Sequence, residues 1–186
     1  MKLKRLVTVL LGLSIILNIF MFYEYRKYKQ ITMNNAQYML SAIFINADEL
    51  DMELKKIIID TNEVDNDQLN RMQKNYENII INSYNLRDTA IKSGRKNNKK
   101  IGNFAGYGIK YVDLNDFILG IKKEDKDCKI VITKEDINSL MKIRSHINDI
   151  QKVRDKYTYI KDDTRHIKFD EWIKITKDLS VLGNLK

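Results

Sequence analysis

The chain has 186 residues, with 33 lysines and arginines against 25 acidic residues, so its formal net charge at pH 7 is +8. Cys128 is the only cysteine, which excludes an internal disulfide, a multi-cysteine metal site and a CxxC redox pair. No proline is present, so no helix is interrupted by a missing backbone N–H group.

The segment from Leu6 to Tyr23 (LVTVLLGLSIILNIFMFY) contains no charged side chain. As a helix it spans about 27 Å, close to the hydrocarbon thickness of a bilayer. A basic stretch precedes it and no small-x-small cleavage site follows, which favours an uncleaved anchor over a signal peptide. The sequence therefore predicts a cytoplasmic tail over residues 1–5 and a transmembrane anchor over residues 6–23.

The charges beside the anchor leave its orientation open. Three basic residues lie on each side of it: Lys2, Lys4 and Arg5 before it, and Arg26, Lys27 and Lys29 after it. The positive-inside rule compares the lysines and arginines on the two sides of the segment, so here it favours neither orientation. A short tail before an apolar segment usually stays in the cytoplasm, so the bulk of the chain is predicted to lie outside it.

Heptad spacing follows the anchor. One stripe, called here the inner seam, consists of Met33, Ala36, Leu40, Ile43, Ala47, Leu50, Leu54 and Ile57. Its alternating three- and four-residue steps predict a helix that continues the anchor to about Asp60 and pairs with another helix. A second stripe runs from Leu69 to Ala90 after a polar turn over residues 61–66. Residues 24–94 are thus predicted to form a coiled-coil-like helical hairpin.

Four carboxylates cluster near that turn: Asp60, Glu63, Asp65 and Asp67. An EF-hand loop needs a glycine at its sixth position and a glutamate at its twelfth, and no register starting at Asp60 or Glu63 supplies them. We interpret the cluster as capping the second helix, whose N-terminal end favours negative charge.

Residues 95–111 form a predicted basic loop rich in glycine and aromatic residues. Its candidate binding groups for an anionic ligand are Arg95, Lys96, Lys99, Lys100, Phe104 and Tyr107. Cations beside stacking rings suit an anionic polymer, a lipid headgroup or single-stranded nucleic acid. The alternative is a linker whose aromatic side chains dock on the bundle.

Residues 112–186 are predicted to complete the bundle. A short helix is expected from Asp113 to Ile121, and Ile130–Ile132 is expected to be an extended connector, because a lone strand has no partner. Thr133 and Asp136 resemble a capping box at the start of a long helix. A last helix is expected from Lys168 to Leu182, with Trp172 in the core.

Motifs of common enzymes are absent from the sequence. It has no GxxxxGK[ST] loop, HExxH or GxSxG motif, and no GxGxxG motif after a strand. His146 is expected on the polar side of its helix and His166 in a charged loop, so both are predicted to be solvated rather than metal ligands. No catalytic, cofactor-binding or metal-binding residue is predicted.

The prediction is an all-α protein: a single N-terminal transmembrane helix that continues into a helical hairpin and an antiparallel bundle. The expected function is that of a bacterial, membrane-anchored, non-enzymatic interaction or assembly protein of the cell envelope. Its expected partners are the bilayer and another protein or a second copy, without a cofactor or small-molecule substrate. Two alternatives stay open: a cytoplasm-facing binder of nucleic acid or anionic lipid, and a sensor-like ligand-binding domain.

Overall fold

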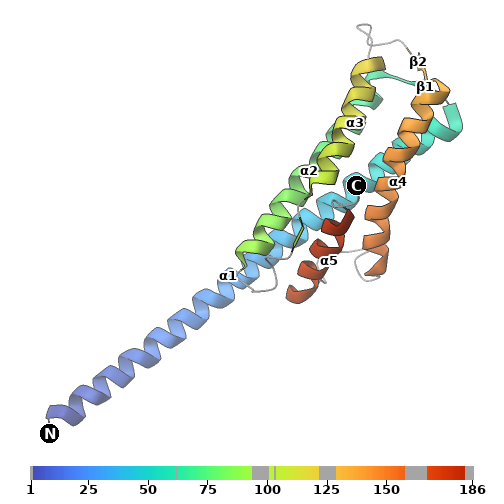
Figure 1. The fold of residues 1–186 in the computed structure, drawn as a ribbon. Coiled ribbons are helices and arrows are strands. Elements are labelled where there is room, and N and C mark those ends of the chain that lie inside the picture. Colours follow the sequence, from blue (N-terminus) through green and yellow to red (C-terminus); the bar gives the residue numbers. More distant parts are fainter. Residues whose placement is uncertain are drawn as a thin grey trace.

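The computed structural model describes residues 2–61, 63–93, 101–102, 104–121, 129–157 and 167–182. This part of the chain is all-α, with one small two-stranded sheet. One long helix, α1 (Lys2–Lys55), projects from a bundle formed by its own second half and the other helices (Figure 1). The large apolar side chains of its first half, from Val7 to Tyr28, are exposed.

α1 passes from its apolar segment into the bundle without a break, as the unbroken stripe pattern predicts. It ends in a π-helical turn, η1 (Lys56–Thr61). The helix contains a window that is apolar enough to cross a membrane, and none of that window is buried inside the protein. Val7, Leu10 and Ile16 in this segment are each about half exposed or more, at 49%, 57% and 64%.

α2 (Asn66–Lys92) returns along α1 in the opposite direction, so the predicted hairpin is present. Two polar contacts show that α2 runs antiparallel to α1. Asn46 pairs with Asn78, whereas Glu53, later in α1, pairs with Arg71, earlier in α2. Asp65 caps α2: its Oδ1 accepts a hydrogen bond of 2.6 Å from the Gln68 N–H group. The capping role predicted for this acidic residue is therefore confirmed.

α3 (Ala105–Ile121) packs against α2 and begins at Ala105, not at Asp113 as predicted. Gly106 and Gly108 were interpreted as loop residues, yet both are helical. A glycine inside a helix costs about 1 kcal/mol relative to alanine. Burial of Tyr107 and Leu114, both 0% exposed, offsets that cost by removing large apolar surfaces from water.

The one sheet in the described residues joins two distant turns at the end of the bundle farthest from the N-terminus (Figure 1). β1 (Glu63–Val64) pairs antiparallel with β2 (Ile130–Val131). Ile130 was expected in an unpaired connector, and this is wrong because the turn after α1 supplies its partner. Lys129 and Glu63 add an ion pair of 3.2 Å beside the ladder.

α4 (Lys134–Lys156) starts with the predicted capping box. The Thr133 side chain accepts from the Asp136 N–H group, and the Asp136 carboxylate accepts from the Thr133 N–H group. α5 (Phe169–Leu182) contacts α4, α1 and α2. Trp172, Thr176 and Leu179 of α5 are fully buried, so the predicted core position of Trp172 is confirmed.

Candidate functional site

The predicted anion-binding set divides into two groups. Arg95, Lys96, Lys99 and Lys100 lie outside the described residues. Phe104 and Tyr107 lie in the core at 0% exposure, and their ring centroids are 5.0 Å apart in an edge-to-face pair. The Tyr107 hydroxyl donates a hydrogen bond of 3.2 Å to the Leu179 carbonyl. These two rings therefore dock on the bundle, and the anion affinity of the basic segment stays a prediction.

The inner seam lies inside the bundle. Seven of its eight residues, Ala36 to Ile57, are 0% exposed, and Met33 is half-buried. α1 turns this face toward α2, α4 and α5, so the seam pairs helices within one chain. It is consequently not available to a separate molecule.

The opposite face of α1 carries a second repeat that sequence reasoning missed. Five large side chains recur every seven residues and are all exposed; we call them the outer stripe: Ile31 (51%), Tyr38 (74%), Ile45 (54%), Met52 (70%) and Ile59 (59%). Scanning every helical register for a seven-residue repeat would have found it. It was overlooked because the inner seam has two apolar residues per heptad and the outer stripe has one.

His146 of α4 occupies an aromatic cluster in the core, so the prediction of a solvated imidazole is wrong for this residue. Its ring lies edge-on to Tyr107 at 4.8 Å and tilted against Tyr76 at 6.3 Å. Only 9% of the residue is exposed. α4 packs against α3 as well as α1, which widens its buried face beyond the narrow stripe in the sequence. His166 lies outside the described residues.

Burial determines the charge state of His146. The pKa of the imidazole is lowered to about 4, chiefly by desolvation; the charge of Asp149 opposes this shift and that of Lys110 adds to it. The side chain is therefore neutral at pH 7. Its Nε2 atom and the Tyr76 hydroxyl are buried without a hydrogen-bond partner in the described part of the chain. Burial likewise raises the pKa of the Tyr76 and Tyr107 hydroxyls above their usual range.

A pocket of about 240 Å³ opens beside this imidazole. It is lined by Gly106, Ile109, Lys110, Lys142, Ser145, His146, Asp149 and Leu182. Two of its charged groups are engaged elsewhere, since Lys110 pairs with Asp113 at 3.2 Å and Asp149 with Lys152 at 2.8 Å. Over the described ranges, no group of three or more histidine, cysteine or acidic side chains could hold a metal ion. The cluster thus supplies packing and borders a small pocket lined by both apolar and charged side chains.

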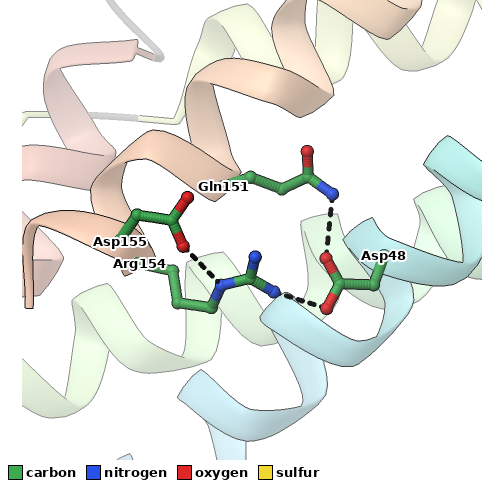
Figure 2. Close-up of polar contacts among 4 residues, drawn as sticks. All are labelled: Asp48, Gln151, Arg154 and Asp155. Carbon is green, nitrogen blue, oxygen red and sulfur yellow. Dashed lines mark hydrogen bonds and ion pairs between the residues drawn. The ribbon is translucent and has the colours of Figure 1, made fainter. Parts of the chain in front are cut away.

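Charged side chains join α4 to α1 near the middle of the bundle (Figure 2). Asp48 of α1 accepts from Arg154 and, at 2.8 Å, from the Gln151 amide. Arg154 also donates to Asp155 at 3.2 Å, so its guanidinium bridges two carboxylates. Farther along, Arg144 donates to Asp51 at 2.7 Å. These contacts fix α4 along α1 between apolar layers.

Arg154→Met is expected to lower the free energy of unfolding by about 1 kcal/mol, because it leaves Asp48 without its cation while keeping the apolar stem. Asp48 is 44% exposed, so water compensates part of the loss. Urea unfolding of the full chain in detergent micelles measures the change. Lys152→Met is the matched control, since Lys152 is 76% exposed and pairs with Asp149 of its own helix. Equal losses in both variants would contradict a specific α1–α4 contact.

No protein-family model, curated protein or solved structure matches this chain. The case for a function therefore rests on the geometry of α1 and of the bundle that it carries.

Proposed function

We propose that the chain is a membrane-tethered, non-enzymatic interaction protein of the bacterial cell envelope. The observation that carries the proposal is the continuity of α1, which joins an exposed apolar segment to a folded bundle through one uninterrupted helix. Bare apolar surface of this length is unfavourable in water and favourable in a bilayer. The bundle would be held at a defined height above the lipid.

The residues after the apolar segment support a membrane boundary at this point. Tyr23, Tyr25 and Tyr28 are 64%, 60% and 52% exposed, and amphipathic rings prefer the headgroup layer. The Arg26 guanidinium lies 4.7 Å from the centroid of the Phe22 ring. Together with Lys29, it places positive charge where anionic headgroups would lie.

An interaction role is supported by the surface of the bundle rather than by any pocket. The outer stripe leaves a row of large apolar side chains in contact with water along α1. Exposed apolar rows of this kind are typical of protein–protein contact sites. Because the inner seam is already used within the chain, the outer stripe is the face with which α1 could bind another protein.

A cysteine-accessibility experiment in intact cells tests this placement. The chain would carry Cys128→Ser and Glu77→Cys, which puts one thiol at an exposed position of α2. A membrane-impermeant maleimide is expected to label intact cells, and the protein is expected to resist extraction by alkaline carbonate. A variant lacking residues 2–23 should appear in the soluble fraction.

The opposite results have defined meanings. Labelling only after lysis would place the bundle in the cytoplasm, where the basic segment near Lys99 could meet nucleic acid. Extraction of the full chain by carbonate would contradict the anchor itself.

A further inference from the structure

We propose that two copies of the chain pair in parallel in one membrane through the outer stripe of α1. This inference rests on the proposed function, because the anchor sets the orientation of both copies. The stripe's residues, Ile31 to Ile59, lie on the face of α1 and η1 that points away from the bundle core. The partner of stated chemistry is a second copy of the same helix.

The repeat length points to a second helix. Side chains spaced by seven residues return to nearly the same side of a helix and keep facing a partner that winds gently around it. The outer stripe holds this spacing over three intervals within α1, from Ile31 to Met52, a length of about 32 Å, and Ile59 continues the row in η1. A groove for a small ligand would not need such a long, regular row.

The anchor explains why the second helix would be a copy in the same direction. Two copies inserted in one membrane present their stripes at equal height, so that each residue meets its own counterpart. All five layers are then apolar, from Ile31 against Ile31 to Ile59 against Ile59. An antiparallel pair centred on Ile45 would match the same five positions, so the anchor, and not the spacing of the stripe, sets the parallel direction. Shared confinement in the bilayer also raises the effective concentration of the partner.

Charged neighbours of the stripe separate the two orientations experimentally. Glu49 and Lys56 are exposed and lie beside the apolar row. In a parallel pair, each would lie near like charge, so added salt should strengthen pairing. In an antiparallel pair centred on Ile45, Glu49 would lie near Ser41 and Lys56 near Asn34 of the other copy, so salt should have little effect on pairing.

Disulfide trapping tests the contact in the full chain. The protein, carrying Cys128→Ser, is reconstituted in phosphatidylcholine–phosphatidylglycerol vesicles with one new cysteine, Ile45→Cys or Met52→Cys. Because a disulfide needs Cα atoms within about 7 Å, both variants should form covalent dimers at least about tenfold faster than the control Glu77→Cys on α2. Equal rates at all three positions would overturn the proposal.

Mixed vesicles establish the orientation. Tyr38→Cys is combined with a Met52→Cys chain that carries a size tag, so that each product has its own mass. Parallel pairing is expected to give only like-with-like dimers. A prominent mixed dimer joining Tyr38→Cys to Met52→Cys would overturn the parallel arrangement.

Apolar-to-charged variants test whether the stripe drives pairing. Ile45→Glu combined with Met52→Glu should abolish energy transfer between labelled copies in vesicles, while the helical circular dichroism stays the same, because both native side chains are mostly exposed. Ile81→Glu on α2 is the matched control, at 49% exposure and off the stripe, and should pair normally. Retained pairing in the double variant would overturn the proposal.

Photocrosslinking distinguishes self-pairing from the binding of a different protein. A photoreactive residue at Ile45 that captures a different protein and never a second copy would overturn self-pairing while leaving the interaction role intact. Release of the chain from membranes by carbonate would remove both proposals together, since the parallel arrangement depends on the anchor.

Discussion

Leu50→Ala is expected to lower the free energy of unfolding by about 2–5 kcal/mol, the range for removing a buried leucine side chain and leaving a cavity. Leu50 is 0% exposed on the inner seam, where it faces the rest of the bundle. The loss should be visible in urea unfolding of the full chain in detergent micelles. Trp172, the single tryptophan and fully buried, reports the transition by fluorescence.

Met52→Ala is the matched control for this prediction. Met52 lies two residues along the same helix but is 70% exposed, so its truncation should change the free energy of unfolding by no more than about 0.5 kcal/mol. Excess detergent keeps copies in separate micelles, so pairing cannot contribute. Similar losses for Leu50→Ala and Met52→Ala would mean that α1 faces the bundle with a different side.

Acidification is expected to destabilise the bundle through His146. Its pKa falls from 6.5 in the unfolded chain to about 4 in the folded one, so between these values the unfolded state binds more protons. Stability is therefore full above pH 6.5 and declines as the pH falls toward 4, where the loss levels off. At 1.36 kcal/mol per pKa unit, the difference corresponds to about 3 kcal/mol.

Two variants isolate this contribution from that of the carboxylates. His146→Leu and His146→Gln cannot titrate, so both should lose about 3 kcal/mol less than the natural chain between pH 7 and pH 4. Their stabilities at pH 7 will differ, because leucine suits the apolar surroundings and glutamine does not. Parallel pH profiles for the natural chain and both variants would contradict a buried, neutral imidazole.

Local sequence patterns predicted most of the helical framework. The inner seam identified the buried face of α1 because periodic burial of Leu40 or Leu54 is a property of one helix. The caps at Asp65 and Thr133 were predicted because a cap depends on residues three positions apart. These features need no knowledge of which elements meet.

Features that depend on contacts between distant segments were not predictable in this way. Val64 and Ile130 pair across 66 positions of sequence, and strands of two residues have no periodicity to find. The burial of His146 depends on α3 lying against α4, and the early start of α3 depends on Tyr107 reaching the core. In each case tertiary packing outweighed a local preference for polarity or for glycine in loops.

The unbroken course of α1 makes it a lever arm. From Tyr23 to Ile59 the helix extends about 54 Å; no proline or loop divides α1, and the π-helical turn η1 lies only at its far end. A tilt of about 10° at the tyrosine-rich level would displace the strand-bearing end of the bundle by about 9 Å. Changes in bilayer thickness or helix tilt would thus be transmitted mechanically to the distal surface, which connects lipid state to the reach of the bundle.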